Sequence, residues 1–245
     1  MKILVCIKQG PDDSEMSRFD EFALEEALLL KAQCREDGMK GARVDVITAG
    51  AATAAAVIKR AFGMGADLGI HIITRKARYV TAFVTASALA AVAGKGGYDL
   101  ILTGVMSQDM MDGQTGPMLA ELLGLPCATG VVKNHLAPAT GIVSVEREME
   151  SGRRDCLEIR LPAVLTIQAG INTPRYPSLS NMLAADKKHI TTLVEGDLFL
   201  TPVRPKESFV AIEHPEQTRT GQRLGGSLDD QVRQFKSFLR EKDLL

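Results

Sequence analysis

The residue types that usually carry catalysis or bind metals are sparse in this sequence and show no recognisable spacing. Its four cysteines are far apart and form no C-x-x-C pair, and its four histidines are equally scattered. No G-x-S-x-G motif is present, and no cysteine has an evident histidine partner. Turns or hydrogen bonding explain the loop carboxylates better than acid–base catalysis does: Asp12, Asp13, Asp109 and Asp112. The sequence therefore predicts neither a metal site nor a catalytic residue.

Two short segments have instead the composition of ligand-binding loops. Residues 48–52, Thr-Ala-Gly-Ala-Ala, are small enough for a ligand to approach the backbone closely. Residues 113–116, Gly-Gln-Thr-Gly, precede an expected helix, where free N–H groups and the helix dipole favour an anion. An ordinary strand-to-helix turn has the same pattern, so both interpretations stay open. Residues 63–69 are glycine-rich but follow a helix, which reverses the context of a dinucleotide fingerprint, and Gly63 and Gly65 are interpreted as helix C-terminal glycines.

These loops separate elements that alternate along the chain. Apolar patterns predict strands over 2–8, 43–49, 69–74 and 99–104, and helices from Ser17, with Asp20 completing a capping box, and over 51–62, 79–93 and 117–123. This order predicts an α/β fold with a mainly parallel sheet and helices on both faces. Ligands of such sheets bind beyond the carboxyl ends of the strands. We therefore expect a site among loops 8–18, 49–52 and 104–116.

The pattern changes after about residue 130. Residues 141–161 are typical of a hairpin that turns at Ser151-Gly152, and another strand follows. From Asn172 the chain is irregular and rich in proline until a final amphipathic helix over 227–241. We expect a ligand-binding α/β domain over 1–190 and an arm over 191–245 that wraps this domain or a partner.

Composition excludes further classes of function. The 245 residues carry a net charge of −1 and no tryptophan, so nucleic-acid binding is not expected. No stretch approaches the ~20 apolar residues that span a membrane. The N-terminal apolar run is too short for the core of a signal peptide. These features favour a cytoplasmic protein with reduced cysteines.

Several segments, taken in order, resemble the β subunit of electron transfer flavoproteins. They cover nearly the whole chain: ILVCIKQGPD, FDEFALEEALLLK, MGADLGIHI, DLILTG, DGQTGPMLAELLGLP, VEREMESG and LPAVLTIQAGINTPRYPSLSNML. Each segment alone would be weak evidence for this resemblance, but their order along the chain is specific to the family. The resemblance implies a fold of the adenine-nucleotide α-hydrolase type, which is Rossmann-like and agrees with the parallel sheet predicted above.

The resemblance also implies a function as an electron carrier rather than an enzyme. In that family the β subunit pairs with a larger α subunit that carries the redox-active FAD. The heterodimer takes electrons from acyl-CoA dehydrogenases or related flavoenzymes and passes them to a membrane quinone oxidoreductase or another acceptor. The β subunit binds AMP, and in electron-bifurcating members the same pocket holds a second FAD that accepts hydride from NADH.

The family's nucleotide pocket matches residues from four places in this sequence. The implied cofactor-binding residues are Cys6, Ser17, Arg18, Phe19, Asp20, Ala49, Gly104, Val105, Met106, Ser107, Gln108, Asp109, Met110, Met111, Asp112, Gly113, Gln114 and Thr115. Gln114 and Thr115 are expected near the phosphate, where backbone donors replace a Walker lysine.

The loop from Asp109 to Thr115 bears on the choice between AMP and a second FAD. Bifurcating members typically read D-G-D-T-A-Q-V there, whereas Met110 and Met111 crowd this loop, which favours AMP. The chain also departs from both types. It lacks a stretch between Pro11 and Met16, has Ser17-Arg18 for the usual Asn-Pro, and has Val105 where a basic residue is common.

The resemblance implies two contacts with partners. Residues 174–186 match a loop that docks dehydrogenases through one leucine, here Leu179, with Tyr176 and Met182 beside it. Glu148 matches a glutamate that contacts the mobile flavin domain of the α subunit. From the residues alone, Leu179 could equally pack inside, and Glu148 could be a solvated carboxylate. A universal-stress-like, homo-oligomeric ATP-binding protein is a further alternative for the whole chain.

Overall fold

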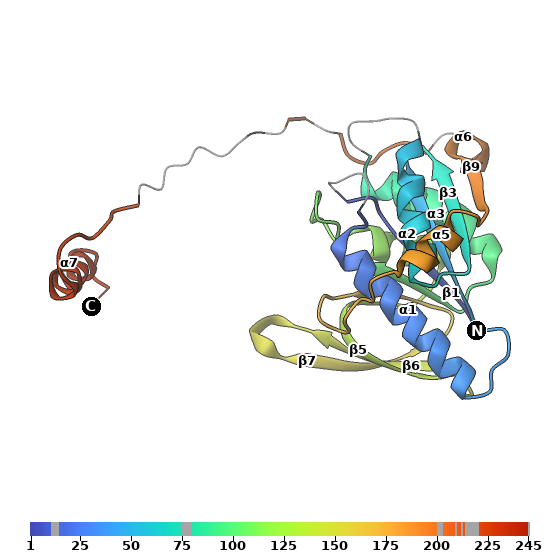
Figure 1. Cartoon of the computed structure of the whole chain (residues 1–245), viewed down its shortest axis with the longest axis horizontal. Coiled ribbons are helices and arrows are strands. Elements are labelled where there is room, and N and C mark those ends of the chain that lie inside the picture. Colours follow the sequence, from blue (N-terminus) through green and yellow to red (C-terminus); the bar gives the residue numbers. More distant parts are fainter. Residues whose placement is uncertain are drawn as a thin grey trace. The chain divides into compact units, whose positions relative to one another are not determined.

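The computed structural model describes residues 1–10, 15–74, 80–199, 203–208, 210–211, 213 and 221–244 (Figure 1). These residues belong to two compact units, Met1–Ser208 and Phe209–Leu245, and each is described by itself. Some positions named above lie outside the described residues: Pro11, Asp12 and Asp13, and Tyr79 at the expected start of the third helix. Most of the shortened first loop lies outside them as well.

The first unit is built on one sheet. Its strands within the described residues are β1 (Lys2–Cys6), β2 (Arg43–Gly50), β3 (Leu68–Ile73), β4 (Leu100–Gly104), β5 (Cys127–Ala137), β6 (Ile142–Glu148), β7 (Arg154–Arg160), β8 (Ala163–Ile167) and β9 (Ile190–Val194). They run in the order β7-β6-β5-β8-β4-β1-β2-β3-β9. Only the β5–β6 and β6–β7 pairs are antiparallel. The prediction of an α/β fold with a mainly parallel sheet is therefore confirmed.

Helices cover both faces of this sheet (Figure 1). The first unit contains α1 (Arg18–Glu36), a 3₁₀ turn η1 (Ala52–Ala54), α2 (Ala55–Met64), α3 (Ala82–Gly96), α4 (Thr115–Leu123), η2 (Glu150–Gly152), α5 (Leu179–Ala185) and α6 (Glu195–Leu198). Side chains of α1 and α2 share one buried cluster, and side chains of α3 and α4 share another. The chain is thus wound on both faces, as right-handed crossovers require.

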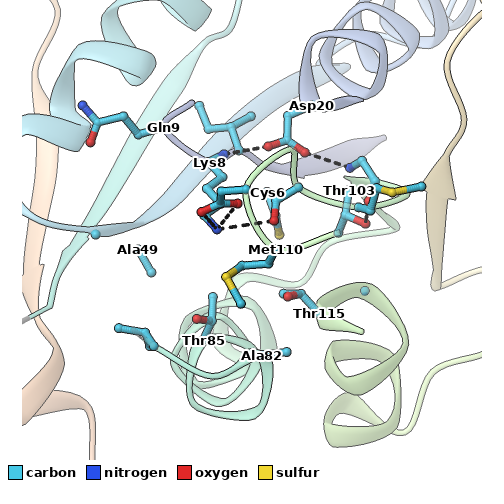
Figure 2. Close-up of a pocket in the computed structure, with 18 of the residues that line it drawn as sticks. Cys6, Lys8, Gln9, Asp20, Ala49, Ala82, Thr85, Thr103, Met110 and Thr115 are labelled. Carbon is cyan, nitrogen blue, oxygen red and sulfur yellow. Dashed lines mark hydrogen bonds and ion pairs between the residues drawn. The ribbon is translucent and has the colours of Figure 1, made fainter. Parts of the chain in front are cut away.

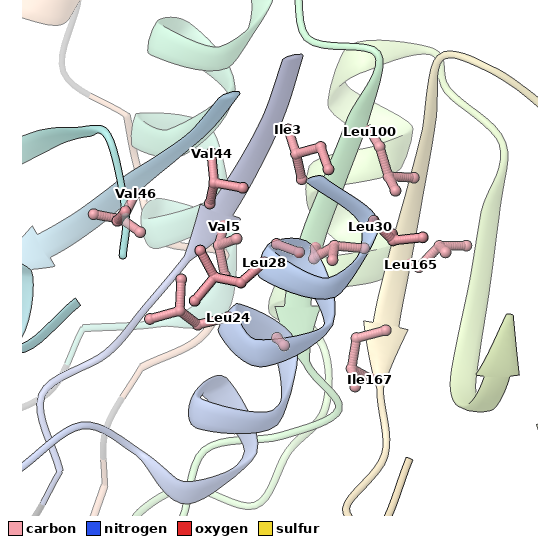
Figure 3. Packing of buried hydrophobic residues seen from close by; sticks show 14 of the residues in the cluster. Ile3, Val5, Leu24, Leu28, Leu30, Val44, Val46, Leu100, Leu165 and Ile167 are labelled. Carbon is pink, nitrogen blue, oxygen red and sulfur yellow. The ribbon is translucent and has the colours of Figure 1, made fainter. Parts of the chain in front are cut away.

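The alternation of β1 explains the two buried clusters. Ile3 and Val5 point to the face covered by α1, where they pack with Leu24 and Leu28 (Figure 3). Leu4, between them in the sequence, belongs to the cluster on the opposite face. A central parallel strand with both faces covered must be apolar throughout, which is the reason for the continuous apolar run at the start of the chain.

Two strands were not anticipated, β5 and β9. The polar run Lys133-Asn134-His135 interrupts the apolar pattern of β5, and its pairing register shifts between Val131 and Lys133. The short strand β9 pairs only with β3 among the described strands, at the edge of the sheet. The arm expected from residue 191 would begin inside β9, whereas the first compact unit extends to Ser208.

The second unit contains α7 (Leu228–Glu241). The Ser227 hydroxyl accepts a hydrogen bond from the Asp230 backbone N–H at 3.3 Å, and the Asp230 carboxylate accepts one from the Ser227 N–H at 3.1 Å. This capping box fixes the helix start that the sequence predicted. Within the unit, apolar side chains of α7 remain exposed, among them Val232, Phe235 and Phe238.

Candidate functional site

A cavity of about 330 Å³ lies at the carboxyl ends of β1, β2 and β4 (Figure 2). The strand order places β1 between β2 and β4. The chain runs from β1 to β2 on one side, and it reaches β4 on the other side only after β3. The strand order therefore reverses beside β1, which is where open α/β sheets bind their ligands.

Most of the residues implied by the family resemblance line this cavity. They are Cys6, Asp20, Ala49, Gly104, Val105, Met106, Ser107, Asp109, Met110, Asp112, Gly113, Gln114 and Thr115. The lining does not include Ser17, Arg18, Phe19, Gln108 or Met111. Of these, the Arg18 N–H donates to the Gln108 side-chain oxygen at 3.1 Å. This pair fastens the loop to the start of α1, and neither residue lines the cavity.

The three loops expected near the site contribute further lining residues, which are Lys8, Gln9, Gly10, Gly50, Ala51 and Gly116. The structure adds residues from outside these loops: Ile7, Ala54, Thr74, Val80, Ala82, Thr85, Leu89 and Thr103. Ala82, Thr85 and Leu89 belong to α3, and no local pattern distinguishes their helix face from any other small-residue face.

The Asp20 carboxylate joins three elements at the cavity wall. It accepts the Lys8 N–H at 2.8 Å and the Gly104 N–H at 3.0 Å (Figure 2). A Cβ on Gly104 would lie 2.5 Å from the Asp20 oxygen, so glycine permits this approach. The predicted capping box is therefore wrong, and the Ser17 hydroxyl has no hydrogen-bond partner. The local pattern assigned the Asp20 carboxylate to the helix start, but it accepts hydrogen bonds from N–H groups elsewhere in the chain instead.

Burial has a large effect on the two titratable groups deepest in this site. It raises the pKa of Asp20 to about 7, although the two N–H donors and the Lys8 ammonium act in the opposite direction. Burial and, to a smaller extent, the charge of Asp20 raise the pKa of the Cys6 thiol. Cys6 therefore stays protonated and packs as a small apolar group rather than acting as a nucleophile.

Lys8 connects β1 to the loop over 104–115. Its ammonium lies 2.7 Å from both carboxylate oxygens of Asp109 and 3.4 Å from the Ser107 hydroxyl (Figure 2). Partial burial acts to raise the pKa of Asp109, but hydrogen bonds from Lys8 and Ser107, and the Lys8 charge, hold it below its ordinary value. Among the lining residues that the structure describes, Lys8 alone carries a formal positive charge.

Two helices begin at the cavity wall. The first turns of α3 and α4 contribute Ala82 and Thr115 to the lining (Figure 2). A Cβ on Gly116 would lie 2.5 Å from Thr166 and 2.9 Å from Thr103, so glycine lets α4 start close to the sheet. Free N–H groups and helix dipoles at such starts attract anions. Together with Lys8, they suit an anionic group.

The other walls are apolar or weakly polar. Cys6, Ala49 and Leu89 line the cavity, and the Met110 side chain points into it toward Thr85 (Figure 2). Met111, by contrast, is 68% exposed and is absent from the lining. The Asp20, Asp109 and Asp112 carboxylates also line the cavity, and Lys8 is paired with Asp109. The site therefore combines apolar walls with helix N-termini that offer N–H donors. That combination can hold an anionic ligand with a flat apolar ring.

The described residues offer little for chemistry beyond binding. No group of three His, Cys, Asp or Glu residues among them could hold a metal ion. The Asp20 carboxylate is occupied by backbone donors, and Asp109 is occupied by Lys8.

None of the helices searched in the described part of the chain is long and apolar enough to cross a membrane.

The segment over 174–186 presents apolar side chains to solvent. Leu179 is 79% exposed and Tyr176 is 85% exposed, so the alternative in which Leu179 packs inside is wrong. Leu183 is 61% exposed and lies one helical turn beyond Leu179 on α5. Met182 turns the other way, toward Gly63 of α2. Gly63 is thus a packing position within α2, whereas Gly65 ends that helix.

Glu148 ends β6 and is exposed. One of its carboxylate oxygens accepts a hydrogen bond from the Gln168 side-chain amide at 3.3 Å. This contact is long for a hydrogen bond. The Glu148 carboxylate is accessible from solvent because the residue is exposed.

A family model described as the electron transfer flavoprotein domain matches residues 3–198. The matched range contains the residues that line the cavity, the strands β2 to β9, all of β1 except Lys2, and the exposed segment over 174–186.

Proposed function

This chain belongs to the electron transfer flavoprotein family, and from that premise we propose that it is the β subunit of a heterodimeric electron transfer flavoprotein. Family membership supports electron transport and flavin binding in general. The order of the sequence motifs supports the β rather than the α subunit. The family match also favours this function over the universal-stress-like alternative.

The cavity is the observation that carries the proposal, and its chemistry fits AMP. Its volume of about 330 Å³ is at the small end of the range of ligand pockets. Cys6, Ala49 and Leu89 offer apolar atoms to an adenine ring, while the starts of α3 and α4 offer N–H groups to a phosphate. The Lys8 ammonium, which is paired with Asp109, also lines the cavity. We infer that Gln114 and Thr115 lie near that phosphate.

AMP in this pocket would stabilise the fold rather than take part in electron transfer. A ligand that binds only the folded state raises stability by mass action. The alternative is a second FAD in the same pocket, as in bifurcating members that oxidise NADH. Met110 disfavours it because its side chain takes up space that a dinucleotide would need. Met111 does not contribute to this argument, since it lies outside the cavity.

The redox chemistry belongs to the FAD, which would be held mainly by the α subunit. In our proposal this chain binds that subunit and brings it to its electron donor. The exposed Leu179 and Tyr176 would dock an acyl-CoA dehydrogenase-type flavoenzyme. Glu148 would contact the flavin domain of the α subunit. The electrons would then pass to a quinone oxidoreductase or another acceptor.

The second unit supports an obligatory partner. Val232, Phe235 and Phe238 of α7 are all at least 42% exposed and recur at helical spacing. A helix with such an apolar face needs another surface to cover it. We propose that residues beyond 190 contribute to the surface that binds the α subunit.

Co-expression with the α subunit tests the proposed function. We expect a tagged copy of the chain to co-purify with the α subunit as a heterodimer that carries FAD. Phe235→Asp should reduce the yield of heterodimer because it places a charge on the apolar face of α7. A matched control is Lys236→Asp, which also introduces a carboxylate at an exposed position of α7. A stable homo-oligomer that binds ATP and ignores the α subunit would contradict the proposal.

A further inference from the structure

The exposed segment over 174–186, called the docking segment below, is held in place by carboxylates of α1. Glu21, Glu25 and Glu26 lie in the first half of that helix. Leu24 and Leu28 on the same helix are buried against β1 and β2 (Figure 3). The carboxylates therefore project from an element that the core fixes in position.

Glu25 makes the strongest of these contacts. One carboxylate oxygen accepts the Arg175 backbone N–H at 3.1 Å and the Arg175 Nε at 2.8 Å, and the other accepts Nη2 at 2.8 Å. The Glu25 side chain is only 5% exposed. A carboxylate that is buried to this degree depends on its partner, and the two-pronged geometry fixes the guanidinium plane.

Neighbouring contacts extend this attachment. Glu26 accepts a hydrogen bond from the Asn172 side chain at 2.8 Å. Glu21 accepts two from Arg60, at 3.0 and 2.7 Å, and the guanidinium of Arg60 lies 5.4 Å from the centre of the Tyr176 ring. The chain just before and at the start of the docking segment is thus attached to α1 at consecutive points.

The far end of the docking segment is attached to α2. Lys59 lies 2.8 Å from the Asp186 carboxylate. Pro177 and Met182 pack against Gly63, where an added Cβ would lie 3.0 Å from Pro177. With both ends and its inner face held, the segment has its two exposed leucines, Leu179 and Leu183, on the outer side.

We infer that Glu25 is a positioning residue for partner docking, because it holds Arg175 and thereby the conformation in which Leu179 and Leu183 face outward. The inference rests on the proposed function of the docking segment. Affinity is lost when a binding surface must first be ordered. An anchor buried in α1 removes that cost without touching the partner.

The test compares Glu25→Gln and Arg175→Lys with wild type in the purified heterodimer. The lysine keeps a charge beside Glu25 but removes the two-pronged contact, so the buried carboxylate is not orphaned. We expect both variants to speed hydrogen exchange in residues 174–186. We also expect at least a threefold higher KM for an acyl-CoA dehydrogenase that reduces the wild-type heterodimer, with kcat and nucleotide content unchanged. Glu36→Gln, at the exposed end of α1, is the matched control.

Leu179→Ala separates the inference from the proposed function. It should raise the KM while exchange in the docking segment stays at the wild-type rate. If Leu179→Ala leaves the KM unchanged, docking through this segment is wrong. If Leu179→Ala raises the KM but Arg175→Lys and Glu25→Gln do not, the role of Glu25 is overturned and the docking surface stands. A fall in kcat alone in these two variants would also overturn it.

Discussion

At the scale of single residues, Asp20 shows how one carboxylate can organise a binding pocket without reacting. It fixes the carboxyl ends of β1 and β4 to α1 through the Lys8 and Gly104 N–H groups. Burial nevertheless raises its pKa to about 7. A group with a folded-state pKa above its unfolded value binds more protons when folded.

Stability should therefore depend on pH through Asp20 in a definite direction. Between about pH 4 and pH 7 the folded state holds the extra proton, so this contribution to stability falls as the pH rises, by up to about 1.4 kcal/mol per pH unit. Asp20→Asn removes the titrating group and should remove this slope. Asn also turns an amide N–H toward one of the two donors, which should cost about 1–3 kcal/mol.

Urea-unfolding midpoints measured across this pH range check both effects. The control is Asp37→Asn, which changes an exposed carboxylate at the other end of α1. The unfolding midpoint can be plotted against pH for wild type and for Asp20→Asn. Plots that stay parallel between about pH 4 and pH 7 would refute the role given to burial of Asp20.

At the scale of elements, the loop over 104–115 depends on contacts that its own sequence does not contain. Lys8 holds it through Asp109, and the Arg18 N–H holds it through Gln108. The loop motif could be found from its glycines and its place before a helix. The residues that fasten it come from the first strand end and the first helix, about a hundred positions away, so no local pattern contains them.

Lys8→Met should loosen this loop and speed the loss of AMP. The Lys8 side chain is 42% exposed, so its pair with Asp109 is worth no more than about 1 kcal/mol. We expect AMP to leave the heterodimer about two to five times faster during dialysis. Lys59→Met, which breaks an exposed ion pair on α2, should leave the rate unchanged. Equal rates for the two variants would show that Lys8 does not hold the pocket closed.

The strand predictions succeeded for continuous apolar runs and for the hairpin of β6 and β7, but they missed β5 and β9. β1 and β4 are continuous apolar runs, which is the pattern of a covered parallel sheet. β5 carries exposed polar residues and a register shift, and β9 is a short, largely exposed edge strand. Both depend on pairing with distant strands, which local propensity does not contain.

At the scale of the whole molecule, the chain has a cavity of ligand size but no evident chemistry of its own within the described residues. Two groups of exposed apolar residues, one in the docking segment and one on α7, belong to different compact units. This distribution fits a subunit that assembles with other proteins. The amphipathic helix could be predicted from its local pattern, whereas the exposure of Leu179 was implied by the family resemblance and not by the local pattern. The anchoring of the docking segment by α1 could not be predicted, since it joins residues about 150 positions apart.

The nucleotides released from the denatured heterodimer test the central claim, that the pocket holds AMP, most directly. Chromatography of the released nucleotides should give AMP and FAD in equal amounts, with the AMP assigned to this chain and the FAD to the α subunit. FAD at twice the amount of heterodimer, without AMP, would contradict the account. The space taken up by Met110 would then not exclude FAD, and the bifurcating alternative that oxidises NADH would replace the proposed function.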